Sequence, residues 1–270
     1  MMSAAFDFDR IAVPFRMQPG LRRLADGEPQ LTPLLAGSPL WHEKQAVLMA
    51  GASRLQQPGF DPAPALAAIA RQAAMQGLPM ASETTPLELA FEEDFAVLEG
   101  AGATLPWLCV CVPSHWAPEE KLGLPFAEVH GPVADNSALL AAARHLVELV
   151  TAGERWERFV WTITPSPRYD QHPRRHAREP WPNEGDPQAF AARCWLRAER
   201  QTFLPVGGVT GQAVFTIRVM LKPLVEAVDT PAKAQRLHGA LASMSPAVLA
   251  YKNLTGARDP VLRWLAQRTG

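Results

Sequence analysis

The chain has 270 residues, 47% of them hydrophobic, so it is long enough to bury a sizeable core without disulfides or a structural metal. Its 26 Lys and Arg residues balance 27 Asp and Glu residues, for a formal net charge of -1. Because positive charge is not in excess, composition provides no general attraction to nucleic acid or to an anionic membrane. We therefore expect no nucleic-acid partner and no membrane partner.

The cysteines and the N-terminal sequence favour a cytoplasmic protein. Cys109, Cys111 and Cys194 are too few and too irregularly spaced for a disulfide framework, an iron–sulfur cluster or a zinc ribbon. Asp7 and Asp9 stand where a signal peptide would have a basic patch and an apolar run. No segment approaches the ~18 continuous apolar residues of a membrane span.

The first part of the chain predicts an arm followed by one domain. Residues 1–60 are rich in Pro and Gly, which favours an irregular N-terminal arm, and residues 61–270 are expected to form a single α+β domain. Residues 63–76 consist of strong helix formers with apolar residues at helical spacing, which predicts a helix. Residues 107–112 are apolar on both faces and bounded by prolines, as in a strand in the middle of a sheet.

The second part of the chain predicts a helix, three strands and a helical C-terminus. Asp135 and Asn136 are suitable N-cap residues for a helix whose apolar stripe reaches Val150. The strands are residues 156–163, 194–203 and 212–220, and the last two flank the turn sequence LPVGGVTG as a hairpin. After Pro223 three segments each open at a proline that the first turn of a helix tolerates. The expected fold is α+β, with an antiparallel sheet, flanking helices and a C-terminal helical cap.

Residues 165–187 form a long, polar, proline-rich segment between two predicted strands. A connection of this length without regular structure is usually either functional or disordered. The segment is therefore either a lid over a site or a mobile surface excursion.

Arg200 is the first residue that its surroundings single out. The motifs of phosphate loops, HExxH metalloproteases, GxSxG hydrolases and CxxC sites are missing from the sequence. On the strand around residue 200, the even positions are small or apolar, and Arg200 interrupts that face. An Arg on an apolar face needs an anion. The anion is either an internal carboxylate, such as Glu93 or Glu128, or the carboxylate of a bound ligand.

His130 is the second such residue. It ends the segment LPFAEVH, interpreted as a strand, and is followed at once by Gly131-Pro132, which leads the backbone away. That placement suits an axial metal ligand, whose ring must be held in one orientation. The alternative is a hydrogen-bonded structural histidine. The remaining histidines have less suggestive surroundings: His42, His115, His145, His172, His176 and His238.

Five segments, in order and spacing, resemble the haem-dependent oxidative N-demethylase alpha-subunit-like family. They are EEDFAVLEG (92–100), CVPSHWAPEEKLGLPFAEVHGPV (111–133), LRAERQTFLPV (196–206), AVFTIRVMLKPL (213–224) and LAYKN (249–253). The resemblance implies a PAS-like antiparallel sheet with flanking helices and a haem b group (iron protoporphyrin IX) between sheet and helix. It also implies a monooxygenase-type oxidoreductase that oxidises a small methylated amine with O2, using electrons from separate flavin and iron–sulfur components.

The resemblance also implies roles for particular residues. His130 becomes the expected axial ligand of the iron, with Glu128 considered as the group that fixes its ring, and Arg200 the expected partner of a haem propionate. Arg197 and Glu199 would then lie on the opposite strand face and support the site from outside or line a second contact. Lys121 and Arg218 are further candidates for contact with the propionates or the pocket. Trp116, Trp161 and Phe215 are candidates for the walls around the macrocycle.

Two departures from the family pattern leave alternatives open. Family members tend to carry Asn-Trp where this chain has Val160-Trp161, and Thr-Tyr where it has Val219-Met220. If the missing polar groups orient an amine, the protein would keep haem without turning over dimethylamine. The alternatives to the enzyme are therefore a non-catalytic haem sensor or haem-binding protein, and a haem-free interaction domain in which His130 and Arg200 are structural.

Overall fold

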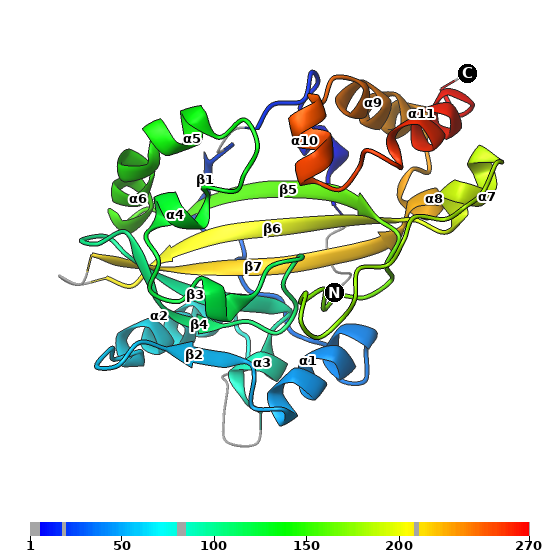
Figure 1. Ribbon diagram of the computed structural model, residues 1–270. Coiled ribbons are helices and arrows are strands. Elements are labelled where there is room, and N and C mark those ends of the chain that lie inside the picture. Colours follow the sequence, from blue (N-terminus) through cyan, green and yellow to red (C-terminus); the bar gives the residue numbers. More distant parts are fainter. Residues whose placement is uncertain (1–5, 18–19, 80–84, 208–210, 270) are drawn as a thin grey trace.

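The computed structural model describes residues 6–17, 20–79, 85–207 and 211–269. Their strands form one antiparallel sheet of seven strands in the order β1-β5-β6-β7-β3-β4-β2 (Figure 1). The strands are β1 (Arg22–Arg23), β2 (Arg54–Gln56), β3 (Glu93–Glu99), β4 (Thr104–Cys109), β5 (Trp156–Thr164), β6 (Trp195–Pro205) and β7 (Gln212–Pro223). The predicted α+β class with an antiparallel sheet and flanking helices is thereby confirmed.

Helices surround the sheet and are mostly short. The 3₁₀ turns are η1 (Phe8–Arg10) and η2 (Pro118–Glu120). The helices before β5 are α1 (Pro39–Met49), α2 (Ala63–Met75), α3 (Leu87–Ala90), α4 (Phe126–Val129), α5 (Ser137–Ala141) and α6 (Ala143–Thr151). Those after β5 are α7 (Pro187–Ala192), α8 (Leu224–Ala227), α9 (Pro231–Ala242), α10 (Pro246–Tyr251) and α11 (Arg258–Ala266). In the described part of the chain, no helix has both the length and the hydrophobicity to cross a bilayer.

The three longest strands, β5, β6 and β7, are neighbours in the sheet and correspond to the strands that the sequence predicts. The hairpin of β6 and β7 is confirmed, with Arg200 paired to Arg218 in the register; residues 208–210 of its turn lie outside the described residues. Because neighbours across an antiparallel pair point to the same side of a sheet, the register divides the side chains of β5–β7 between two faces.

One face carries the large core. Buried residues of α2, among them Ile69, pack against Val97 of β3 and Val214 of β7. At the other end of the same strands, Leu196 and Ala198 of β6 pack against α7, α9 and α11, which include the fully buried Trp264. The C-terminal helical cap is thus confirmed, and Figure 1 shows α7–α11 gathered at one end of the sheet.

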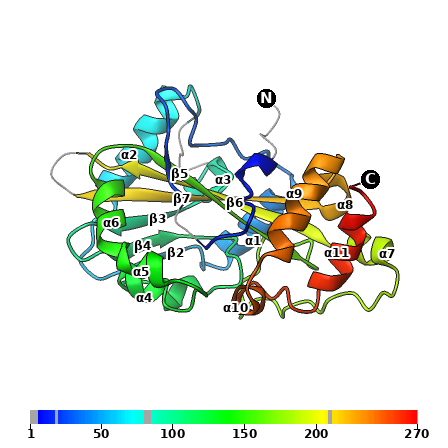
Figure 2. The same cartoon turned by 90° about the horizontal axis from the view of Figure 1, so that it is seen from above.

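The second face is only partly covered. Val147 and Val150 of α6 pack against Leu98 and Phe203, and Figure 2 shows α4–α6 on the side of the sheet away from α2. The rest of this face lies under the irregular segment that joins β4 to α5 and under the segment that joins β5 to α7. The space between these segments and the strands is the cavity described below.

Four expectations need correction. The first 60 residues contain α1 and β2, because Ser38 caps a helix that tolerates Pro39 in its first turn, so this part of the chain is less irregular than expected. The predicted central strand, β4, is second from an edge, because β2 pairs with it on the outside. The helix expected behind Asp135 is divided into α5 and α6. His130 follows the helix α4 instead of ending a strand.

Candidate functional site

A cavity of about 540 Å³ lies on the second face of the sheet. Its volume falls within the ~300–1,000 Å³ of small-molecule and cofactor sites. Strands β3–β7 form its floor, and the segment from Ser114 to Val133 covers it. Its aromatic lining residues are Trp116, Phe126, Trp161, Phe203, Phe215 and Tyr251. Its charged lining residues, histidines aside, are Glu120, Lys121, Arg158, Arg178, Arg197, Glu199 and Lys252.

His130 lines the cavity, and a hydrogen bond at Nδ1 holds its ring in place. Its Nδ1 is 2.9 Å from the carbonyl oxygen of Phe126, four residues earlier, and the rings of the two residues are in contact, with centroids 4.1 Å apart and planes tilted by 33°. A carbonyl only accepts hydrogen bonds, so Nδ1 carries the hydrogen and Nε2 of the neutral ring has a free lone pair. Burial lowers the pKa of His130, which favours the neutral ring at pH 7. Histidine ligands of metals are held in this way.

Arg197, Ser114 and Glu199 form a polar chain on the cavity floor. The Nε of Arg197 donates to the Oγ of Ser114 at 2.7 Å, and Ser114 donates in turn to the Oε1 of Glu199. The other guanidinium nitrogens of Arg197 donate to the carbonyls of Val112 and Arg168. The side chain of Arg197 is thus held in place, but within the described chain it has no carboxylate within 4 Å.

Arg158 is a cavity cation with a shielded guanidinium nitrogen. It lies on β5, opposite Gln201 of β6. Its Nε is shielded from solvent and has no hydrogen-bond partner among the described residues, and none of the ion pairs of this part of the chain includes it. Burial lowers the pKa of Arg158. A shielded guanidinium nitrogen without a partner is costly, so this wall of the cavity is suited to an anionic ligand.

Two further residues of the lining have perturbed pKa values. Burial, with the charges of Arg178 and Arg197, lowers the pKa of His115 to about 4, and its φ of 60° is rare for a residue other than glycine. Burial lowers the pKa of Lys252 to about 8. The Nζ of Lys252 donates to the carbonyl of Trp161 at 2.8 Å. Such values and strained backbone are frequent at functional sites.

The long segment 165–187 adds its own residues to the cavity. Gln171, Pro173 and Arg178 line it. The segment is attached to the rest of the protein, because the backbone N–H of Asp170 donates to Glu43 of α1 at 2.6 Å and Arg175 donates to the carbonyl of Cys111 at 2.9 Å. The segment has no helix or strand before α7, as expected, and it lies over the site.

Six of the eight residues singled out for the cofactor site line one cavity: Trp116, Lys121, His130, Trp161, Arg197 and Phe215. Arg200 and Arg218 are not among the lining residues. They are cross-strand neighbours and therefore lie together on the other face. Arg218 donates to Glu92 at 2.6 Å. Glu128, considered as the partner of His130, is exposed, and the Phe126 carbonyl takes that role.

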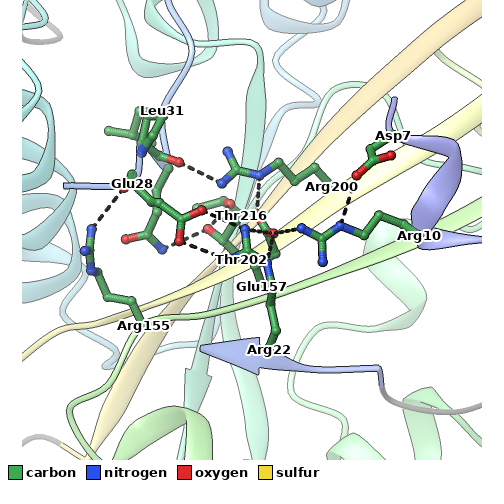
Figure 3. A network of polar contacts seen from close by, with 12 residues as sticks. Asp7, Arg10, Arg22, Glu28, Leu31, Arg155, Glu157, Arg200, Thr202 and Thr216 are labelled. Carbon is green, nitrogen blue, oxygen red and sulfur yellow. Dashed lines mark hydrogen bonds and ion pairs between the residues drawn. The ribbon is translucent and has the colours of Figure 1, made fainter. Parts of the chain in front are cut away.

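Arg200 takes part in a separate network, shown in Figure 3. Its Nε donates to the Oε2 of Glu157 at 2.6 Å, and its Nη2 donates to the carbonyl of Pro29. Glu157 is 1% exposed and also accepts from Arg22. The internal carboxylate expected as one alternative for Arg200 therefore exists, but it is Glu157 and not Glu93 or Glu128. Arg197 and Glu199 were expected on the strand face away from the haem, but they face the cavity. Arg200 was expected at the haem, but it lies on the opposite face.

Sequence reasoning missed Arg158, His115 and Lys252, and it placed Glu199 outside the site. A signal for Arg158 was present: it alternates with Glu157 and Phe159 on β5 and thus belongs to the opposite face. His115 and Lys252 come from an irregular segment and from the residue after α10, so strand alternation could not find them.

The fold and the site together define an α+β protein with a partly apolar, cation-rich cavity of cofactor size. Residues 70–262 match the family model described as "Haem-dependent oxidative N-demethylase, alpha subunit-like". The chain belongs to this family, as its sequence segments indicated. Among the residues that the structure describes, no three His, Cys, Asp or Glu side chains come together as a metal site.

Proposed function

We propose that this protein holds haem b in the cavity and oxidises a small methylated amine with O2. The observation that carries the proposal is the placement of His130: its ring lines the cavity, and the Phe126 carbonyl fixes Nδ1 so that Nε2 is free to bind a metal. A haem iron needs only an axial side chain from the protein, because the macrocycle supplies the other ligands. Residues 61–270 would form a single PAS-like haem domain.

The charges of the cavity support a haem with two propionates. Among the described residues, Arg158 has no partner at Nε, and Arg197 donates to one hydroxyl and two carbonyls. Together with Lys121 they would pair with the propionate carboxylates. Trp116 and Phe215 would pack against the apolar macrocycle, since both line the cavity. When bound, haem would supply the iron at which O2 is activated and the amine oxidised.

The electrons are proposed to come from separate flavin and iron–sulfur components. The three cysteines of the chain, Cys109, Cys111 and Cys194, are all buried, and burial raises their pKa values. Buried thiols of this kind are inert, so these side chains are structural. The protein would then be the haem-carrying part of a larger system.

The test is an absorption spectrum of the protein purified from cells supplied with a haem precursor. A Soret band that shifts with carbon monoxide after dithionite is expected. Formaldehyde release from dimethylamine, with an added reductase, is expected to follow. A protein without a Soret band despite available haem would overturn the proposal.

One observation favours a second candidate, a haem-binding sensor without turnover. Val160 lines the cavity beside Glu199, and Val219 lies on the other side of Glu199 in the same row. Polar groups at these two positions are typical of the family, and apolar ones provide less for orienting an amine. Haem binding without formaldehyde release would favour this candidate.

A further inference from the structure

Glu199 is the buried carboxylate of the cavity. Two carboxylates line the cavity in the described part of the chain, Glu120 and Glu199. Glu120 has a side chain that is 56% exposed and forms an ion pair with Arg174 at 2.5 Å. Glu199 is only 9% exposed. The carboxylate of Glu199 is therefore the one that a ligand inside the cavity would meet.

The partners of Glu199 are neutral. Its Oε1 accepts from Ser114, and its Oε2 accepts from the side-chain amide of Gln201 at 2.7 Å. Across the described residues, no Lys, Arg or His nitrogen comes within 4 Å of it. Each oxygen retains a further lone pair, because a carboxylate has about four acceptor sites. Arg158, Arg197 and Lys252 act on Glu199 only from beyond ion-pair distance. A buried carboxylate without a cation in direct contact is stabilised when a ligand supplies one.

The nearby cations are already engaged or are suited to other anions. Lys252 donates to the carbonyl of Trp161 and lies over the rings of Trp161 and Phe15. Arg197 is held by Ser114 and two carbonyls. If the propionates of a bound haem pair with Arg158 and Arg197, as proposed above, the positive charge around Glu199 is neutralised. Glu199 would then be the charge in the cavity that still needs a partner.

The surroundings of Glu199 are apolar and aromatic. Val160 is its direct cross-strand neighbour on β5 and shares the cavity lining with Tyr251. The pKa of Tyr251 is raised by burial and then by the charge of Glu199, as expected for a phenol close to that carboxylate. Aliphatic and aromatic side chains around one carboxylate are typical of sites that bind alkylammonium ions, whose N–H donates to the carboxylate while the alkyl groups pack on the walls.

From this arrangement we infer that Glu199 binds the charged nitrogen of an alkylammonium substrate, with Val160 and Tyr251 contacting its alkyl groups. Glu199 is thus a substrate-positioning residue. The inference rests on the proposed function for the reaction, but the binding of the cation depends only on residues of this chain.

The experiment compares wild type with Glu199→Gln and Glu199→Asp, each loaded with haem. Dimethylammonium chloride is titrated at pH 7, and binding is followed by calorimetry and by the change of the Soret band. Glu199→Gln is expected to keep its haem and to bind dimethylammonium at least tenfold more weakly, with Glu199→Asp in between. Glu148→Gln is the matched control and should bind like wild type, because Glu148 is exposed on α6 and does not line the cavity. 2-Propanol and acetate, as uncharged and anionic probes, should bind more weakly than dimethylammonium.

Several outcomes separate this inference from the proposed function. If Glu199→Gln binds dimethylammonium as tightly as wild type, or if acetate binds better, the inference is wrong although haem is present. If no variant holds haem, the proposed function fails, and calorimetry on the haem-free protein still tests Glu199. If Glu199→Gln does not fold, Val160→Lys replaces it: a lysine beside Glu199 should abolish dimethylammonium binding and leave the Soret band in place. Unchanged binding in Val160→Lys would overturn the inference.

Discussion

Arg200 and Glu157 form an ion pair at 2.6 Å between β6 and β5, on the face of the sheet opposite the cavity (Figure 3). The side chain of Glu157 is 2% exposed, and that of Arg200 is 14% exposed. Removal of one partner of a buried pair costs ~3–5 kcal/mol because the other charge is left uncompensated. Glu157 retains Arg22, so the lower end of this range applies.

Arg200→Leu is therefore expected to lower the free energy of unfolding of the haem-free protein by about 3 kcal/mol, without changing haem affinity. Urea denaturation and haem titration measure the two quantities. Arg144→Leu is the control, because the Arg144 side chain is 93% exposed in its pair with Glu148 and should change neither. A loss of haem affinity with unchanged stability would instead place Arg200 at the ligand.

Arg158→Met is expected to have the opposite effect. Among the described residues, the Nε of Arg158 is shielded and has no hydrogen-bond partner, and the charge of Glu199 acts on Arg158 from beyond ion-pair distance, so the removal of Arg158 breaks no direct ion pair. The stability of the haem-free protein should stay the same or rise, while haem retention should fall at least tenfold if Arg158 pairs with a propionate. Thermal unfolding and haem transfer to apomyoglobin provide the measurements. Unchanged haem transfer would exclude Arg158 as a propionate partner.

His130→Ala is expected to lose haem, or to give an altered spectrum that added imidazole restores. The reason is that His130 lines the cavity, and its Nδ1 hydrogen bond to Phe126 leaves Nε2 of the neutral ring without a hydrogen. His145→Ala should leave the spectrum unchanged, because His145 is exposed on α6. An unaltered spectrum of His130→Ala in both oxidation states would direct attention to His115, which also lines the cavity. His172 is less suitable, since its Nε2 contacts Glu119 and its Nδ1 accepts from the backbone of Arg174.

Lys252 is expected to make stability depend on pH in the alkaline range. Its pKa is lowered from 10.5 to about 8 by burial, so the unfolded chain holds more protons between these two values. The contribution of Lys252 to stability therefore rises as the pH rises through this window, and its burial cost is fully present below about pH 8.

The Lys252→Met variant removes that pH dependence. Relative to wild type, the variant should gain the most unfolding free energy below pH 8. This gain should decrease as the pH rises from 8 to 10.5. Lys222→Met is the control, because Lys222 is exposed. Denaturant titrations at several pH values measure the difference, and a difference that is constant across pH would contradict the low pKa.

The sequence alone was sufficient where local pattern and packing agree. The helix α2, the strand β5, the hairpin of β6 and β7 and the C-terminal helices all follow from hydrophobic period, caps and prolines. All five segments of family resemblance lie within residues 70–262, the range that matches the family model. The central strand β3 was not predicted from pattern, because Glu93 and Asp94 interrupt its apolar sequence and only their buried partners, such as Lys44, compensate them.

The tertiary structure decided which face of the sheet holds the site. Alternation along β6 established that Arg197 and Glu199 oppose Arg200, but a strand sequence does not tell which side a cavity occupies. That depends on what covers each face: α2 and the C-terminal helices fill one, and the segments around His130 leave space on the other. The sequence determined which residues of β6 share a face. Only the packing of distant segments decided which of the two faces lines the cavity.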